Sequence, residues 1–182
     1  MKVKRIFGEK VYRYASLPST MEKAGELAER GEPEGTVLIA ESQSKGRGRW
    51  GRRWFSPEGG LYFSLILRPG EKKLVKSIPI LAGLSLKRAI KKVTGLASWM
   101  KLPNDILINK KKVAGILLEK KNSFLILGIG INTNIKEEEL TEFSATSLSR
   151  LTGKRIDNKK LLETFLQDFE ESYFVDNFRG KD

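Results

Sequence analysis

The sequence predicts an α+β domain in which helices flank a mixed or antiparallel β-sheet. Short apolar runs bounded by turn residues, such as 61–67 and 124–131, are typical of buried strands. Apolar runs on both sides of the polar turn 109–112 indicate a hairpin, and so antiparallel pairing. Residues 77–93 instead repeat apolar side chains at helical spacing. A chain of 182 residues suits a single domain over 1–182.

The other elements follow from the same two periodicities. Strands are expected over 11–14, 36–41 and 97–101, and the hairpin strands over 102–108 and 113–119. Helices are expected over 21–30, 145–151 and 159–174. Ser19 or Thr20 would cap the first of these helices, and capping is the simpler interpretation of the two hydroxyl groups. The alternative is a small anion site at the free N–H groups of that helix.

Composition narrows the chemistry that this chain can perform. There is no cysteine and no histidine, which excludes disulfides, thiolate metal sites and the usual general base. Apolar residues make up 40% of the chain, enough for a core, and the net charge of +12 admits nucleic acid as a partner. No apolar run is long enough to span a bilayer, so we expect a cytoplasmic protein without membrane contact. Binding and stabilising phosphate charge fits this inventory better than triad hydrolysis.

The most basic stretch, residues 42–54, lies between two predicted strands. It carries Lys45, Arg47, Arg49, Arg52 and Arg53 with no acidic residue among them. Glycines between the charges allow close approach of the backbone to a ligand, and arginine binds phosphate or carboxylate oxygens in pairs. We expect a loop that closes over a small polyanion and is open without it. The alternative is a flexible basic loop that contacts nucleic acid.

Two more stretches concentrate unusual residues. The turn Pro103-Asn104-Asp105 opens the predicted hairpin, and Lys112 stands at the start of its returning strand. Gly128 and Gly130 alternate along an otherwise apolar strand that ends in Asn132. Glycine at alternate positions of a buried strand indicates that something packs closely against that face.

Taken in order, these three stretches resemble the biotin protein ligases. The similarity rests on 46–52, on 101–105 with 112–115, and on 128–132, and it spans roughly residues 10 to 175. It implies the biotin/lipoate ligase fold, which is class II synthetase-like, with helices packed on one face of a mixed sheet. It also implies that biotin reacts with ATP and Mg²⁺ to give biotinyl-5′-adenylate. A lysine of a biotin carboxyl carrier domain, as in acetyl-CoA carboxylase, then takes the biotinyl group.

The same resemblance implies roles for individual residues. Lys112, Arg49 and Asp105 match catalytic positions, and Asp105 would orient or deprotonate the attacking amine or bind Mg²⁺. No residue is assigned firmly to a metal. ATP would be bound by Arg52, Asn104 and Asn132. Biotin and its adenylate would be bound by Ser19, Thr20, Gln43, Gly46, Arg47, Gly48, Arg49, Trp54, Lys112, Gly115, Gly128 and Gly130.

Departures from the family pattern shape the remaining expectations. Met21 stands where a polar residue is common, and Leu102 replaces a common tryptophan. We expect a catalytic domain without the N-terminal helix-turn-helix and the small C-terminal barrel of these ligases, and therefore no repressor role. A homodimer is compatible with the resemblance. A lipoate-type ligase is the nearest enzymatic alternative, and a basic nucleic-acid-binding domain is the non-enzymatic one.

Overall fold

The computed structural model describes residues 5–70, 74–121, 123–140 and 144–178. A seven-stranded sheet forms the centre of the molecule, with strand order β1-β2-β3-β7-β6-β5-β4. Only β1 and β2 pair in parallel, and every other neighbouring pair is antiparallel. The strands are β1 (Val11–Leu17), β2 (Val37–Gln43), β3 (Leu61–Leu67), β4 (Trp99–Lys101), β5 (Asp105–Ile108), β6 (Lys111–Lys121) and β7 (Phe124–Ile131). The helices are α1 (Thr20–Glu29), α2 (Ile78–Thr94), α3 (Leu148–Thr152) and α4 (Asn158–Phe178).

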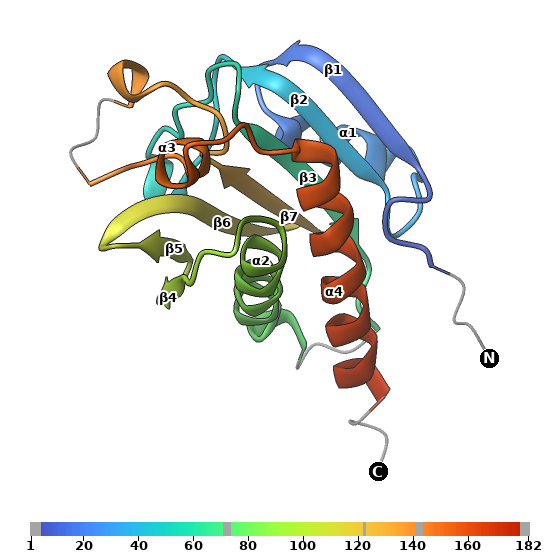
Figure 1. Ribbon diagram of the computed structural model, residues 1–182. Helices are drawn as coiled ribbons and strands as arrows, with labels where there is room; N and C mark the ends of the chain where they lie inside the picture. Colours follow the sequence, from blue (N-terminus) through green and yellow to red (C-terminus); the bar gives the residue numbers. More distant parts are fainter. Residues whose placement is uncertain (1–4, 71–73, 122, 141–143, 179–182) are drawn as a thin grey trace.

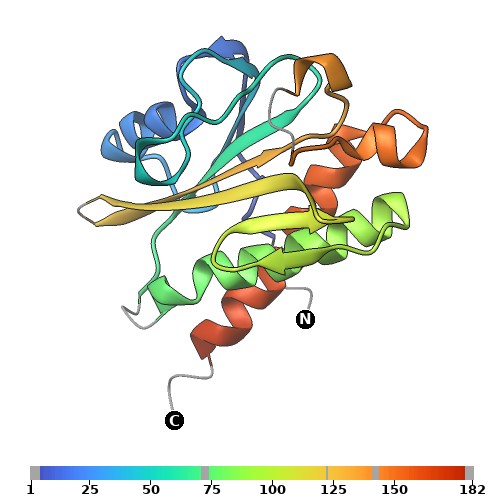
Figure 2. The same ribbon diagram turned by 90° about the vertical axis from the view of Figure 1, so that its left-hand side faces the viewer.

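Helices cover both faces of the sheet, unlike the one-face arrangement that the resemblance implies. The long helices α2 and α4 lie against one face, and α1 lies on the opposite face near β2 and β3 (Figures 1 and 2). The mixed sheet flanked by helices is confirmed, but the placement of α1 corrects the expectation. The reason is the parallel β1–β2 pair, because the chain must return between those strands and α1 forms that connection.

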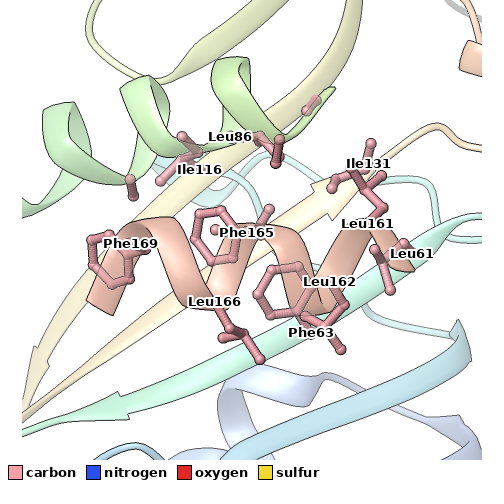
Figure 3. Close-up of a cluster of buried hydrophobic side chains, with 14 of the residues drawn as sticks. Leu61, Phe63, Leu86, Ile116, Ile131, Leu161, Leu162, Phe165, Leu166 and Phe169 are labelled. Atoms are coloured by element: carbon pink, nitrogen blue, oxygen red, sulfur yellow. The ribbon is translucent and has the colours of Figure 1, made fainter. Parts of the chain in front are cut away.

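The main core lies between the sheet and the helices α2 and α4. Phe165 of α4 is fully buried between Phe63 of β3, at 5.5 Å between ring centroids, and Phe169, at 5.4 Å (Figure 3). Leu86 of α2 and Ile116 of β6 belong to the same cluster. Burying aromatic and branched side chains of this size is the dominant stabilising term for such a domain.

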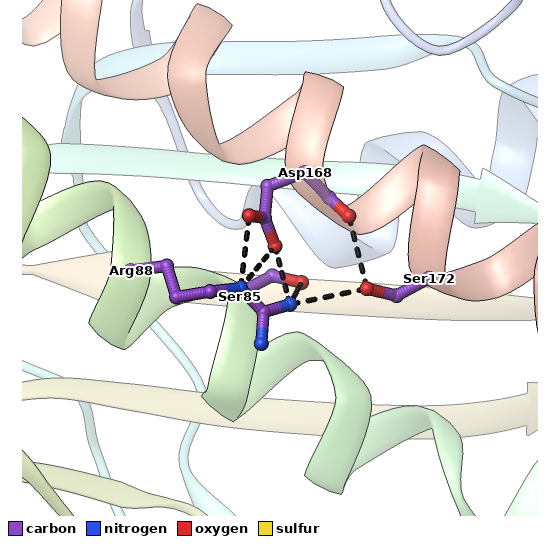
Figure 4. Close-up of polar contacts among 4 residues, drawn as sticks. All are labelled: Ser85, Arg88, Asp168 and Ser172. Atoms are coloured by element: carbon purple, nitrogen blue, oxygen red, sulfur yellow. Dashed lines mark hydrogen bonds and ion pairs between the residues drawn. The ribbon is translucent and has the colours of Figure 1, made fainter.

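An ion pair also connects α2 to α4 at the surface. Arg88 donates from Nε to both carboxylate oxygens of Asp168, at 2.8 and 2.9 Å, and from Nη2 to Ser85 and Ser172 (Figure 4). The Asp168 carboxylate raises the pKa of Arg88 above its ordinary value, chiefly through these hydrogen bonds. Since the two side chains are 52% and 28% exposed, solvent screens much of their attraction.

Most element boundaries agree with the predicted ranges, and one expected helix is shorter. Helix α3 begins only at Leu148, while residues 145–147, expected to be helical, are extended and run beside β6. The hairpin turn is also tighter than predicted, because Asn109 and Lys110 alone form it with left-handed φ angles of 50° and 64°. Among the described residues, none of the helices is both long and apolar enough to cross a bilayer.

We predict that apolar burial, rather than the surface ion pair, holds α4 to the domain. Phe165→Ala should lower the free energy of unfolding by about 3–5 kcal/mol, because it leaves a cavity between Phe63 and Phe169. Asp168→Asn should cost about 1 kcal/mol or less, because the ion pair is partly exposed. Urea unfolding of both variants measures the difference. A larger loss for Asp168→Asn would contradict this interpretation.

Candidate active site

A pocket of about 370 Å³ lies on the sheet face that carries α1, beyond the area that the helix covers. Its floor is formed by β6 and β7, and its sides by the start of α1, the basic loop, the turn 102–105 and Ala145. Its size is that of a small-molecule site. Of the predicted site residues, all but Gly46 line it: Ser19, Thr20, Gln43, Arg47, Gly48, Arg49, Arg52, Trp54, Asn104, Asp105, Lys112, Gly115, Gly128, Gly130 and Asn132.

Two glycines make the floor flat. Gly115 of β6 and Gly130 of β7 are directly paired across the two strands. The Trp54 indole lies over both, and a Cβ built on Gly115 would come within 2.8 Å of that ring. Any side chain at either position would therefore displace Trp54. The indole Nε1 lies against Gly130, is buried and has no hydrogen-bond partner among the described residues.

The basic loop is a short folded hairpin, not an open segment. Trp54 N–H donates to the Gly46 carbonyl, at 2.9 Å, and Gly48 N–H donates to the Arg52 carbonyl, at 2.7 Å. Gly46 lies beneath this turn, where a side chain would collide with Trp54 and Ser56. At the tip, Trp50 is 83% exposed and has a left-handed φ of 59°. The tip is therefore held by few contacts, although the base of the loop is well bonded.

The loop arginines differ in their partners. Arg49 Nη1 donates to Asn104 Oδ1 at 3.3 Å, which connects the loop to the hairpin turn. Arg47 instead forms an ion pair with Glu119 of β6, with 2.8 Å between Nη2 and Oε1. Arg53 donates to the Ser44 carbonyl. The ion pair of Arg47 was not predicted. Glu119 is 72 positions away, and the sequence does not show that β6 places this residue beside the basic loop.

Lys112 is the most tightly placed cation of the pocket. Its Nζ lies 2.9 Å from Asp105 Oδ1 and 5.0 Å from the centre of the Trp54 ring. The contact with Asp105 is an ion pair and lacks the alignment of a good hydrogen bond. Both side chains are 26% exposed, so they are accessible to a ligand.

The backbone of Lys112 is fixed on both sides by the segment 144–146. Lys112 N–H donates to the Ser144 carbonyl, at 2.6 Å, and the Lys112 carbonyl accepts from Thr146 N–H, at 3.0 Å. Asn132 is buried and donates its side-chain amide to the Thr146 carbonyl, at 3.2 Å. Asn132 was predicted to bind ATP, but here its amide supports the segment that positions Lys112.

Neutral polar groups form the part of the pocket near α1. Gln43 Oε1 accepts from Thr20 N–H, at 2.8 Å, and from the Thr20 hydroxyl, at 3.1 Å. Thr20 Oγ1 in turn accepts from the Ser64 hydroxyl, and Gln43 Nε2 donates to Ser56. This network fixes the Gln43 amide, whose second N–H hydrogen has no part in these bonds.

Ser19 does not act as the expected helix cap. It occupies the N-cap position of α1, but its side chain makes no capping hydrogen bond. Its hydroxyl is buried and has no partner among the described residues. An unpartnered buried hydroxyl is costly unless a ligand satisfies it, so the simpler capping interpretation is wrong for Ser19.

Several lining residues were not predicted as part of the site. Met21 had been noted only as a departure from the family pattern. Apolar side chains complete the walls and rim, namely Met21, Trp50, Phe55, Leu102, Leu117 and Leu140, whereas the side chains of Ile116 and Ile129 belong to the main core on the other face. The sequence does not distinguish these apolar pocket residues from core residues, because the same residue types occur in both places. The described residues contain no cluster of three or more acidic side chains, histidines or cysteines that could hold a metal by themselves.

Comparison with known proteins shows which family the chain resembles in sequence and in fold. The profile of the biotin/lipoate A/B protein ligase family matches residues 14–135. The chain is 38% identical, over 179 residues, to the bifunctional ligase/repressor BirA of Bacillus subtilis. The aligned region covers 92% of this chain and 55% of that protein. It is 35% identical to the biotin–[acetyl-CoA-carboxylase] ligase of Paracoccus denitrificans, covering 72% of this chain and 60% of that enzyme. The chain thus spans little more than half the length of these relatives.

Solved structures show the same fold. The biotin protein ligase of Aquifex aeolicus in complex with biotin and ATP is 40% identical, with a TM-score of 0.81 over 91% of this chain and 71% of that one. The Leishmania major biotin protein ligase in complex with biotinyl-5-AMP is 26% identical, with a TM-score of 0.80 over 92% and 76%. The chain described here belongs to the biotin/lipoate A/B protein ligase family.

Proposed function

We propose that this chain activates biotin with ATP and transfers the biotinyl group to a lysine of a biotin carboxyl carrier domain. The observation that carries the proposal is the position of Lys112, beside Asp105 and Trp54 in a pocket that also holds Arg49 and Asn104. Relatives named as biotin ligases, and one structure with biotin and ATP, support the same substrates. The reaction is assigned to the cytoplasm, and no DNA-binding role is part of the proposal.

In the first step, a carboxylate oxygen of biotin attacks the α-phosphorus of ATP, and pyrophosphate leaves. Negative charge grows on the α-phosphate oxygens as the new bond forms, so a fixed cation stabilises the transition state more than the ground state. Lys112 is the proposed cation, held by its backbone and by the Asp105 carboxylate. Arg49 would approach from the loop, and Arg52 would meet the leaving phosphates.

The neutral end of the pocket suits the ureido ring of biotin. A ureido group offers one carbonyl acceptor and two N–H donors, and it carries no charge. The Ser19 hydroxyl and the second Gln43 N–H hydrogen are available there. The Trp54 indole, which lies over Gly115 and Gly130 and lines the pocket, gives the ring of biotin an aromatic wall. Preorganised groups of this kind reduce the entropy cost of binding.

In the second step, the amine of the carrier lysine attacks the acyl carbon, and AMP leaves. Asp105 is the only carboxylate among the described residues that line the pocket. When a phosphate engages Lys112, the Asp105 carboxylate becomes available to orient the amine or to accept its proton. Asn104, which bonds Arg49, sits beside it at the entrance.

Magnesium is an expected participant and fits the residues present. Mg²⁺ commonly uses one or two carboxylates together with substrate phosphates, and Asp105 supplies such a carboxylate. The ion, when bound, would neutralise charge on the phosphates of ATP.

Direct detection of the mixed anhydride tests the proposed function. The protein is incubated with ATP, Mg²⁺ and biotin, and biotinyl-adenylate is sought by mass spectrometry. A parallel incubation with lipoic acid distinguishes the lipoate-type alternative within the family. Formation of lipoyl-adenylate alone would assign the other acid, and no adenylate with either acid would overturn the proposal.

We predict that Lys112→Ala slows adenylate formation by about 100-fold or more while biotin affinity changes by only a few fold. Removing one preorganised cation from developing phosphate charge has an effect on the order of 3 kcal/mol. Single-turnover kinetics measures the chemical step, and calorimetry measures biotin binding. Lys111→Ala is the matched control, because Lys111 belongs to the same hairpin but is exposed. Equal rates for the Lys112→Ala and Lys111→Ala proteins would remove Lys112 from the mechanism.

We also predict that ligands protect the basic loop from trypsin. The exposed tip at Trp50 should open frequently in the free protein, so cleavage should occur first between Lys45 and Arg53. Saturating biotin with ATP should slow this cut at least tenfold, because bound phosphates hold the arginines. The exposed bond after Lys154, outside the pocket, serves as an internal control. A loop cleaved equally fast with and without ligands would not be a lid.

A further inference from the structure

Met21 and Gly128 form a contact at the end of the pocket next to α1. Met21, the second residue of α1, is only 5% exposed, and both residues line the pocket. A Cβ built on Gly128 would lie 2.5 Å from Met21 Sδ and 2.7 Å from its Cγ. The methionine side chain therefore lies in the space that a residue other than glycine would fill.

This contact is distant from the reactive groups. Gly128 of β7 pairs with Ser64 of β3, which bonds Thr20, whereas Asp105 lies on β5. From β7, which carries Gly128, the sheet continues through β6 to β5, which is two inter-strand steps or about 10 Å. A ligand with its acidic group at Lys112 thus directs its other end toward Met21.

Met21 has no room to retreat. On its other side lies a buried cluster consisting of Ala24, Ala28, Leu38, Ile66, Phe124 and Ile126. Protein interiors are packed at the density of organic crystals, so a displaced thioether cannot enter this cluster without strain. The open space of the pocket is the remaining direction, and the methionine side chain is flexible enough to move there.

We propose that Met21, seated over Gly128, is the wall that limits the size of the ring end of the acid substrate. The pair is then a specificity determinant that acts on the shape of the acid and not on its reaction. This inference rests on the proposed function only in requiring that the pocket holds a carboxylic acid with its ring near α1. The substrate class is an acid whose ring end is compact, with an apolar edge toward Met21 and polar groups toward Ser19 and Gln43.

A double-mutant cycle on this pair tests the wall, with calorimetric binding of biotin as the readout. Gly128→Ala should raise the dissociation constant for biotin at least about tenfold, because Met21 is pushed into the pocket. Combining it with Met21→Ala should return the affinity to within about threefold of Met21→Ala alone, since the colliding atoms are gone. Desthiobiotin, which has a smaller ring end, should lose less affinity than biotin in Gly128→Ala.

Controls distinguish a direct effect of Met21 on biotin binding from an effect of misfolding. Gly25→Ala also adds one methyl group on α1, against the flexible Lys121 side chain, and should leave biotin binding unchanged. Melting temperatures verify that each variant is folded, and if the double variant is too unstable, the comparison of biotin with desthiobiotin in Gly128→Ala alone decides the role of the pair. A folded Gly128→Ala protein with wild-type biotin affinity, a double variant without rescue, or equal losses for biotin and desthiobiotin would each overturn the wall.

The same measurements distinguish the two proposals. If the wild-type protein binds lipoic acid but not biotin, the proposed substrate is wrong, and the cycle measured with lipoic acid still decides the role of the pair. A wild-type protein that binds neither acid overturns both proposals.

Discussion

The contact between the Trp54 indole and the bare backbone of Gly115 and Gly130 is the constraint on which the pocket depends. Because the two glycines are paired on adjacent strands, they leave a flat area wide enough for a ring. Trp54 closes the base of the basic loop through its bond to Gly46, so the indole fixes where the loop emerges over the sheet. The same ring contacts Lys112. The position of the basic loop, the flat pocket floor and the position of the Lys112 ammonium group therefore all depend on the Trp54 indole and on the absence of side chains at Gly115 and Gly130.

Strand β7 shows how one segment specifies both a core and a site. Leu125, Leu127, Ile129 and Ile131 face the helices α2 and α4 and belong to the main core. On the other face, Phe124 and Ile126 pack with α1, and then Gly128 and Gly130 follow at the same alternation. The change from large side chains to glycine marks the line where helix cover ends and the pocket begins. Alternation of side chains across a strand makes this division possible.

The parts of the fold that the sequence predicted are those governed by local periodicity. Strand β3 was predicted with its observed bounds, and α2 within one residue at each end, because uninterrupted apolar patterns define both. The segment 145–147 was misassigned because it has no regular partner strand, only a bridge to Lys112 and the Asn132 amide. Those are tertiary contacts, which a local pattern does not contain. The absence of a capping bond from Ser19 has the same origin. The sequence shows that a serine stands at the N-cap position, but it does not show in which direction the hydroxyl points.

The site residues were predicted through resemblance more than through chemistry, and their roles remain predictions. What the residues alone could not reveal is how firmly Lys112 is held. A lysine side chain loses about 2 kcal/mol of rotamer entropy when it is fixed, so a free surface lysine is a poor source of preorganised charge. Here the backbone is bonded on both sides, and the ammonium group is held between Asp105 and Trp54. Asn132 extends this support by one more bond, through Thr146, so its amide can affect the chemistry at Lys112 by positioning the segment that holds the lysine backbone.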